Sequence, residues 1–598
     1  MNDLELLKKY EPIIYFNKAE MFYPCAVDRY IEKCSLWIRD PNGKKTLIEP
    51  ANQLNVDRLA EYEKVLPGYT LYLQYVDQPL RGLQYLAWVQ KRPRFQAIGR
   101  LTRVYMFSRI LDSLFDLSLQ LRGTVPGGTT AQAQIQYEQS REKDPRFVYY
   151  GRVKREGGYI VLHYLYFYVM NNWRTGFFGI NDHEADWEQV FIYLSDEGLR
   201  DPQPMWVAYA SHDFSGDDLR RRWDDPDIRI EEETHPVIYA GAGSHASYFQ
   251  QGEYLMNSEI RALAPLNTFI YRAKKFWAMI GQGSHLADDI QTRENLFSIP
   301  FVDYARGDGV RLGIGDWHPI LIGDDTDWVN TYRGLWGLDT NDVFGGERAP
   351  AGPKFNRDGS TRQAWHNPLG WAGLLKVEPP QSSIAVLREK IALLQHELMQ
   401  VDTGIKQLRD DIRMDELEVK ALNASAHLIE LYKRKDTELA LNEVKLNDLY
   451  KRKNELIVTI NASNRYLADL ESGKKTDPKS HIRHHHHPEP PVQAPSRLLE
   501  FWAALSSGLL LFALAIFLLF NTTNWFTGVF IVIILFIAIE AALRRNLGNF
   551  LLNAVIMLSI IASLVLVGEF LRLFLLIILV IFGSRLIWEN LQEINNKQ

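Results

Sequence analysis

Residues 159–169 read YIVLHYLYFYV, and residues 180–194 read INDHEADWEQVFIYL. Both stretches contain dense runs of β-branched and aromatic residues, the types that strands favour. Turn-forming residues, EGG before the first stretch and DPQP after the second, mark where such strands would begin and end. Similar short runs follow at 205–210 and 235–243, whereas residues 101–121 have helical spacing. We therefore predict a β-rich domain of the α+β class.

The composition changes along the chain, whose 598 residues are enough for several domains. Residues 1–378 are rich in aromatic residues, glycine and proline, and both glycine and proline become rare over 382–470. Residues 471–497 are polar and contain proline and histidine, and residues 499–588 are mostly apolar. These boundaries predict a β-rich head, a helical stalk, a flexible linker and a membrane domain.

Charge and cysteine content restrict the partners and the compartment. The net charge of −6 gives no basic surface for nucleic acid, so we expect no nucleic-acid partner. Cys25 and Cys34 are too few for a disulfide framework and favour a reducing compartment. The first residues, MNDLELLKKYEP, lack the apolar stretch of a secretory signal. We therefore expect the head to be cytosolic.

A heptad of apolar residues runs through the predicted stalk. Its a and d positions are Ile384, Leu387, Ile391, Leu394, Leu398, Val401, Ile405, Leu408, Ile412, Val419 and Leu422. Such a strip requires a partner helix. The frame breaks after Asn423 and resumes less regularly, which allows a hairpin folded on itself or one long helix paired with other copies. We expect a homo-oligomer that assembles through this coiled-coil stalk.

Four apolar segments predict a membrane domain with four transmembrane helices. They cover residues 499–520, 525–543, 550–568 and 570–588, each close to the roughly 20 residues that span a bilayer. The connections are short, and the last is a turn around Glu569. If the segments alternate, Arg497, Arg544, Arg545 and Arg585 fall on one side, which the positive-inside rule makes cytosolic. We expect an integral membrane protein with membrane lipids as partners and with its N-terminal domain and C-terminus in the cytosol.

A candidate metal site lies in the second quoted stretch. On a strand, Asp186 and Glu188 point to one face and Trp187 to the other. Two adjacent carboxylates repel each other unless a cation or a proton lies between them. His183, on the entering loop, can reach the same face. One imidazole and two carboxylates can hold a divalent cation, with Ca²⁺, Mg²⁺ or Mn²⁺ favoured over Zn²⁺. The alternative is a salt-bridged acidic cluster beside a core tryptophan.

Several stretches of the head resemble a known family. They are YEPIIYFNKAEMFYPCAVDRYI (10–31), VYYGRV (148–153), YIVLHYLYFYVMNNW (159–173), NDHEADWEQVFIYL (181–194), HPVIYAGAGSHASYF (235–249), YRGLWGL (332–338) and WHNPLGW (365–371). In these stretches, residues 1–370 look like the vacuolar protein sorting-associated protein 62 family. This resemblance implies a family relationship without a particular activity.

A shorter motif resembles a second family. DHEADWE (182–188) is similar to the G-H-R-H-D-W-E signature of necrosis- and ethylene-inducing-like proteins, β-sandwich cytolysins that bind sphingolipid head groups. The resemblance implies a β-sandwich-like head. It also implies a divalent cation held by His183, Asp186 and Glu188, because these positions match the cation ligands of that family.

This chain departs from the signature at two positions. Asp182 replaces its leading glycine, and Ala185 replaces its second histidine. A further acidic ligand of that family corresponds to Asn171 or Asn172 here, where an amide oxygen could still bind a cation. His245, which follows the run at 235–243, is a candidate ligand-contacting or second-shell residue, or an ordinary loop histidine.

These observations predict a membrane-anchored protein whose cytosolic, metal-binding head recognises a lipid or glycan head group or acts as a scaffold at the membrane surface. A non-enzymatic role is favoured. One alternative is a metal-dependent hydrolase, in which open coordination positions activate water. Another is an oligomeric channel or pore formed by the C-terminal segments.

Overall fold

The computed structural model describes two compact units of the chain. The first contains residues 1–96, 118–256 and 302–490, and the second contains 97–117, 257–301 and 491–598. Within them, the structure describes residues 1–63, 67–93, 95, 106, 109, 126–172, 182–196, 202–210, 216–259, 298–339, 349–484, 487–488, 497–520 and 525–595. The helix predicted over 101–121 lies outside these residues except for Met106 and Arg109.

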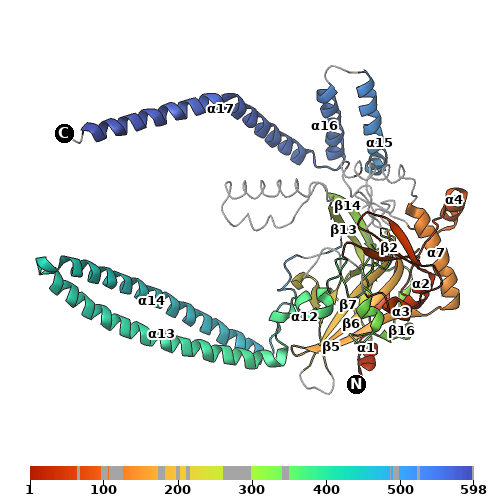
Figure 1. The fold of residues 1–598 in the computed structure, drawn as a ribbon, viewed down its shortest axis with the longest axis horizontal. Helices are drawn as coiled ribbons and strands as arrows, with labels where there is room; N and C mark the ends of the chain where they lie inside the picture. The colour runs from red at the N-terminus through yellow and green to blue at the C-terminus, as the bar shows by residue number, and fades with distance from the viewer. Residues whose placement is uncertain are drawn as a thin grey trace. The chain divides into compact units, whose positions relative to one another are not determined.

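A six-stranded sheet forms the centre of the first unit (Figure 1). In spatial order its strands are β16 (Trp317–Leu321), β5 (Phe147–Glu156), β6 (Tyr159–Asn171), β7 (His183–Ser195), β8 (Pro204–Tyr209) and β9 (Arg220–Arg222). Only β16 and β5 pair in parallel, and the other neighbours are antiparallel. The two stretches quoted at the outset form β6 and β7, so the prediction of a β-rich N-terminal region is confirmed.

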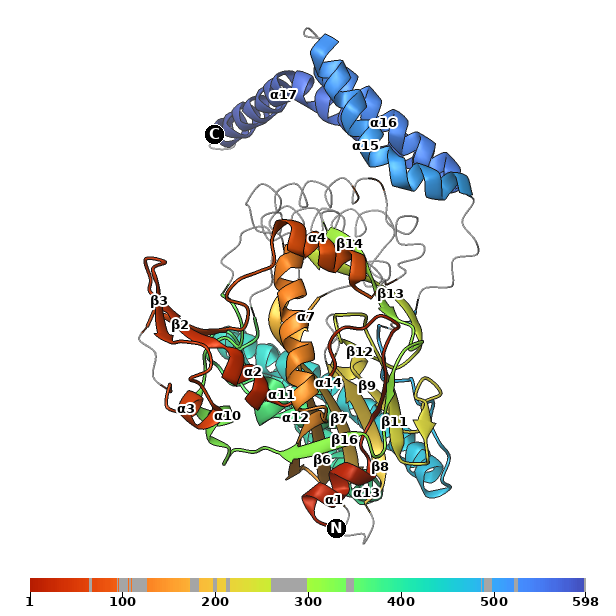
Figure 2. The same cartoon turned by 90° about the vertical axis from the view of Figure 1, so that its right-hand side faces the viewer.

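Smaller sheets complete the β-structure of the described residues. β1 (Ile13–Tyr15) lies between β11 (His235–Ala240) and β15 (Arg311–Leu312). The remaining strands are β10 (Ile230–Glu231) and β12 (Ser247–Tyr248) beside β11, β2 (Ser35–Arg39), β3 (Lys45–Glu49) and β4 (Thr70–Gln74) in a three-stranded sheet, and β13 (Gly252–Glu259) paired with β14 (Ser298–Ala305). Figure 2 shows β2 and β3 at the left of the head.

Both faces of the six-stranded sheet are covered by apolar residues. On one face, Val190 and Ile192 of β7 pack in a cluster with Ile14 of β1 and Ile238 of β11. On the other face, residues of β6 and β7 pack with the three-stranded sheet and with short helices. β7 is therefore buried along most of its length, as its nearly continuous apolar run requires.

Short helices surround the sheets. They are α1 (Asp3–Lys9), α2 (Val27–Lys33), α3 (Val56–Ala60), α4 (Gly82–Lys91), α7 (Pro126–Lys143), α10 (Asp327–Thr331), α11 (Gln363–His366) and α12 (Pro368–Trp371). The side chain of Asn2 accepts a hydrogen bond from the backbone of Glu5 and thereby caps α1.

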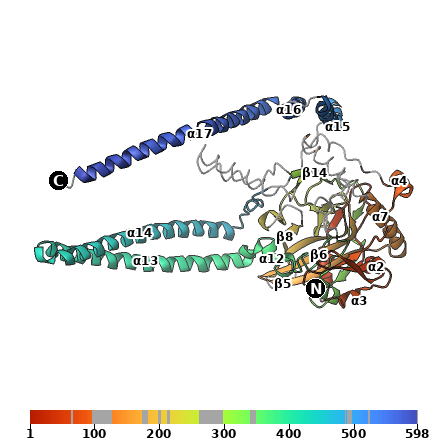
Figure 3. The same cartoon turned by 45° about the horizontal axis from the view of Figure 1, so that its top comes forward.

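The stalk is a helical hairpin. α13 (Pro380–Asn423) and α14 (Ile429–Glu471) run antiparallel side by side (Figure 1 and Figure 3). Ion pairs join Arg388 to Glu471 and Glu397 to Arg452, and Leu394, Leu456 and Ile460 pack between the helices. Of the two sequence-based interpretations, the structure has the hairpin. Each helix of the stalk therefore has its partner helix within the same chain. Self-association of the protein through the stalk stays a prediction.

Part of the predicted linker lies against the head. Three contacts join them: Arg222 to the carbonyl of Thr476 at 2.8 Å, Lys479 to Asp227 at 2.6 Å and His484 to Asp218 at 2.7 Å. The linker expected to be flexible over 471–497 is therefore held in this part. The reason is charge complementarity, because the acidic loop over 217–227 attracts its lysine and histidine side chains.

The second unit contains three long helices, α15 (Arg497–Phe520), α16 (Trp525–Leu543) and α17 (Leu547–Asn595). Among the described helices, two have stretches long and apolar enough to cross a membrane, Leu498–Phe517 and Leu573–Gln592. The turn predicted around Glu569 was wrong, because α17 is continuous there. A single glycine, Gly568, costs only about 1 kcal/mol in a helix and does not end one.

α15 and α16 form an antiparallel pair in which a buried arginine joins both helices. Arg109 donates hydrogen bonds to Ser506 in the first half of α15, at 2.9 Å, and to Glu540 near the end of α16, at 2.7 Å. All three side chains are buried. A buried charge of this kind needs an opposite charge beside it, which Glu540 supplies.

Candidate functional site

Residues 183–188 form the first half of β7 and lie beside the end of β6. In the antiparallel register, His183 is opposite Asn171, and Asp186 is opposite Tyr168. Glu188 shares its face with Val190, and Trp187 packs against the cluster on the other face. Asp186 and Trp187 both line the pocket described below, so the predicted pairing of Asp186 with Glu188 on one face stays a prediction.

Ala185 has an unusual backbone conformation within this strand. Its φ is +59°, in the left-handed region that side chains with a Cβ rarely adopt. The residue is fully buried. His183 Nδ1 lies 2.7 Å from the carbonyl oxygen of Ala185, and only a protonated Nδ1 can donate to that oxygen. The neutral imidazole then has its lone pair on Nε2, the form that binds metal ions.

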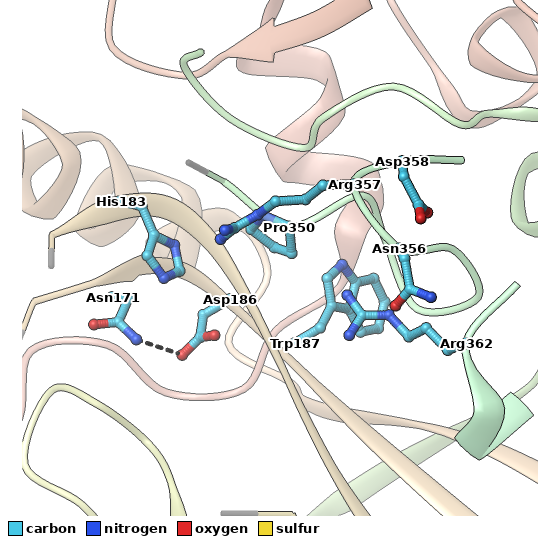
Figure 4. A pocket seen from close by; sticks show the side chains of 9 residues that line it. All are labelled: Asn171, His183, Asp186, Trp187, Pro350, Asn356, Arg357, Asp358 and Arg362. Atoms are coloured by element: carbon cyan, nitrogen blue, oxygen red, sulfur yellow. Dashed lines mark hydrogen bonds between the residues drawn. The ribbon is translucent and has the colours of Figure 1, made fainter. Parts of the chain in front are cut away.

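A pocket of about 500 Å³ opens beside this part of β7. Its lining residues are Asn171, His183, Asp186, Trp187, Pro350, Asn356, Arg357, Asp358 and Arg362. Figure 4 shows His183, Asn171 and Asp186 together on one side, and the guanidinium of Arg362 beside Trp187 on the other. The structure thus places two of the three predicted metal ligands at one pocket, together with Asn171.

Asp186 is held by two side chains. Asn171 Nδ2 donates to its Oδ2 at 3.1 Å, and His245 Nδ1 lies 3.0 Å from the same oxygen. The ring of His245 stacks on Tyr168 with a centroid separation of 3.8 Å. His245 therefore contacts Asp186 without lining the pocket, and its predicted second-shell role stays a prediction.

His245 carries the charge that balances this carboxylate. Burial alone would lower its pKa, but the hydrogen bond to Asp186 and the carboxylate of Glu20, 3.8 Å from Nε2, raise it to about 9. The imidazole is therefore protonated at neutral pH. Its positive charge lies 3.0 Å from the Asp186 carboxylate.

Glu188 lies apart from the pocket. It is buried and absent from the pocket lining, and its carboxylate has no hydrogen bond to any described residue. Burial raises its pKa well above the usual range, and the charges of Asp186 and Asp303 raise it further. Of the three predicted ligands, Glu188 is the one that the structure does not bring to the pocket.

The other candidate residues divide into two groups. Asn171 is only 2% exposed, and its Oδ1 has no hydrogen-bond partner among the described atoms although it lines the pocket. Asn172 and Asp182 do not line the pocket. The backbone N–H of Asn172 donates to Gly243, and Asp182 accepts a hydrogen bond from Thr130. In the described parts of the chain, no group of three or more His, Cys, Asp or Glu residues is arranged to hold a metal ion.

Sequence reasoning missed the opposite wall, which is formed by Arg357 and Arg362. Arg357 lies in the turn closed by the bridge between Phe355 and Thr361, and Arg362 directly follows that turn. Gly359 has the left-handed φ of +81° that the turn requires. The DG pair at 358–359 marks the turn in the sequence. Nothing local indicates that the turn faces β7.

No family model, no curated protein and no solved structure matches the chain. The two family resemblances therefore stay predictions, and the geometry of the pocket carries the functional argument.

Proposed function

We propose that the chain is a membrane-anchored binding protein whose β-rich head recognises the polar head group of a lipid or glycan in the β7 pocket. The observation that supports this most is the composition of the pocket. The amide of Asn171 on β6 and the carboxylate of Asp186 on β7 form one wall of the pocket. Two guanidinium groups form the opposite wall, and Trp187 adds an aromatic surface. A few polar groups that converge in one concavity are typical of ligand sites. The predicted relationship to the vacuolar protein sorting-associated protein 62 family is part of this proposal.

We further propose that a divalent cation takes part in recognition. Asn171 Oδ1, the Asp186 carboxylate and His183 Nε2 would hold it. The buried Oδ1 of Asn171 supports this, because an acceptor without a partner costs about 1–3 kcal/mol unless a donor or cation meets it. The oxygen ligands favour Mg²⁺, Ca²⁺ or Mn²⁺. Bound there, the ion would offer open coordination positions to head-group oxygens. Glu188 would not contact the ion and would affect its binding only through the charge of its carboxylate.

The membrane anchor is proposed to be the C-terminal helices. The antiparallel pair α15 and α16 brings Arg497 to the same end as Arg544 and Arg545, which the positive-inside rule makes cytosolic. Four crossings would require α17 to bend near Gly568, because its 49 residues are about 74 Å long and hydrocarbon is about 30 Å thick. Protease added to intact cells should leave a cytosolic head uncut, and digestion of the head there would contradict this orientation.

The metal proposal is tested with the full-length protein purified in detergent. After incubation with Mn²⁺ and removal of free ion, elemental analysis should find bound metal in the wild type and much less in Asp186→Asn. Asp358→Asn removes an exposed carboxylate at the same pocket and should keep the metal. Equal metal content in the wild type and Asp186→Asn would exclude the site. Hydrolysis of a bound lipid or glycan would instead favour the metal-dependent hydrolase.

A further inference from the structure

We infer that the ligand of the β7 pocket carries a phosphoryl group, which Arg357 and Arg362 bind. This inference rests on the proposed function, because it names the chemical class of ligand that the same pocket takes. The wall opposite Asp186 supplies the argument. It contains two guanidinium groups at one short turn, and each is held in place by the backbone.

The backbone holds both arginines by the same edge of the guanidinium. Arg362 Nε donates to the carbonyl of Phe355 at 2.9 Å, and its Nη2 donates to Gly352 at 3.2 Å. Arg357 Nε donates to Ala349 at 3.2 Å. In Arg362, both N–H groups of Nη1 and one of Nη2 are the remaining donors. A guanidinium fixed by its Nε edge is prepared to bind an anion with two parallel hydrogen bonds.

Arg362 differs from the other inward-facing arginines of the head. It forms no ion pair with any described residue. Four arginines elsewhere in the first unit each pair with a carboxylate: Arg39 with Asp339, Arg152 with Asp324, Arg220 with Asp217 and Arg306 with Glu253. An arginine that lines a pocket without a carboxylate partner is suited to an anion brought by a ligand.

The charges around the two arginines favour an anion with more than one negative charge. Burial lowers the pKa of Arg362, and the positive charge of Arg357 lowers it further, so the two cations are close enough to repel each other. The carboxylates of Glu188 and Asp186 raise this pKa, but neither forms a hydrogen bond or an ion pair with Arg362. A carboxylate would neutralise one of them. A phosphoryl group carries about −1.5 to −2 at neutral pH and three acceptor oxygens, which suits both.

The only carboxylate on the turn itself does not compete for them. Asp358 accepts hydrogen bonds from the backbone N–H of Ser360 at 2.9 Å and from its hydroxyl at 2.6 Å. These bonds turn it toward its own loop. On the far wall, Asp186 is engaged by Asn171 and His245. The pocket is therefore positive on one wall and negative on the other, which suits a phosphorylated, hydroxylated head group.

The experiment measures binding to the full-length protein in detergent by calorimetry. The test ligands are inorganic phosphate, glycerol 3-phosphate, short-chain dihexanoyl phosphatidic acid and, as a neutral analogue, dihexanoylglycerol. The phosphorylated ligands should bind and the neutral analogue should not. Tighter binding of the phosphatidic acid would identify a lipid source, and equal binding of glycerol 3-phosphate would identify a free phosphorylated compound. Binding of dihexanoylglycerol as tight as that of phosphatidic acid would overturn the inference.

Arg362→Gln should weaken phosphoryl binding by roughly 10- to 150-fold, the loss expected for charged hydrogen bonds. Arg362→Lys keeps the positive charge but cannot form two parallel hydrogen bonds, so its affinity for the phosphorylated ligands should lie between those of the wild type and Arg362→Gln. Arg357 is exposed, and Arg357→Gln provides a second variant if Arg362→Gln does not fold. Arg155→Gln, at an exposed arginine paired with Asp3, is the matched control and should bind normally.

Cation uptake separates this inference from the proposed function. Arg362→Gln should still take up Mn²⁺, whereas Asp186→Asn should not. Unchanged phosphoryl affinity in both folded arginine variants would overturn the inference and leave the cation site intact. Failure of the wild type to bind Mn²⁺ and any of the test ligands would remove the proposed function together with the inference.

Discussion

Two buried carboxylates on β7, on either side of Ala185, have opposite environments. Glu184 accepts three backbone hydrogen bonds, from Tyr75 at 3.0 Å, Val76 at 2.8 Å and Leu338 at 3.0 Å. The carboxylate of Glu188 has no hydrogen bond to a described residue, and its neighbours Asp186 and Asp303 are also acidic. A carboxylate surrounded by N–H donors stabilises the fold, whereas a cluster of buried carboxylates beside a pocket indicates a functional site. Burial is the same for both, so it is the partners that distinguish them.

The largest effect should come from Glu184→Gln. The amide would present donors to N–H groups that now meet a carboxylate, so we expect a loss of about 2–4 kcal/mol in the free energy of unfolding. Glu188→Gln should change that free energy by less than about 1 kcal/mol, because burial and the neighbouring carboxylates already favour its neutral form. Urea titration of the full-length variants, followed by pulse proteolysis of the head, measures both. Similar losses of unfolding free energy in Glu184→Gln and Glu188→Gln would show that the two carboxylates do not differ in their contribution to stability.

Ala185→Val should be the next most destabilising change. A β-branched side chain at a φ of +59° costs about 1–2 kcal/mol, and the added methyl groups must enter a filled core. We expect a total loss of about 2–3 kcal/mol by the same urea titration. Ala185→Gly relieves the backbone and should cost less than about 1 kcal/mol. Equal stability of Val and Gly at this position would show that the strand has ordinary backbone geometry there.

The smallest effect concerns a buried carboxylate far from β7 in sequence. Burial raises the pKa of Glu11 to about 7, against the hydrogen bond from Tyr149 that lowers it. Because the folded pKa lies above the unfolded value of 4.5, the free energy of unfolding should fall as pH rises between 4.5 and about 7. Glu11→Gln should remove about 1–2 kcal/mol of this dependence. Parallel pH profiles in wild type and variant would show that Glu11 is not the titrating group.

The elements that the sequence predicted well depend on local pattern. The strands β6 and β7 follow from runs of β-branched and aromatic residues. The heptad could not separate a hairpin from an intermolecular pair, because both satisfy the same apolar strip. The turn at Glu569 was predicted because the apolar stretch over 550–588 is long enough for two membrane spans. No residue within that stretch ends a helix, and α17 continues through it.

The residues that sequence reasoning missed depend on distant parts of the chain. Arg362 reaches the pocket from more than 170 residues after Asp186, and the donors to Glu184 come from positions 108 to 154 residues away. Spacing within the stretch 182–188 favoured Asp186 and Glu188 as a pair. That spacing could not show which of the nearby carboxylates would accept hydrogen bonds from backbone N–H groups.

The position of β1 has a consequence for the synthesis of the protein. Ile13 pairs with Val237 of β11, and Ile14 pairs with Leu312 of β15, so both neighbours of this strand are made long after it. At 5–20 residues per second, about 15–60 s separate the addition of Ile14 from that of Leu312. This apolar strand lacks both of its neighbours until Ile238 is added, after about 11–45 s, and lacks one of them until Leu312 is added. An apolar strand with unpaired edges can pair with other chains, so the head is exposed to such pairing while it is being synthesised.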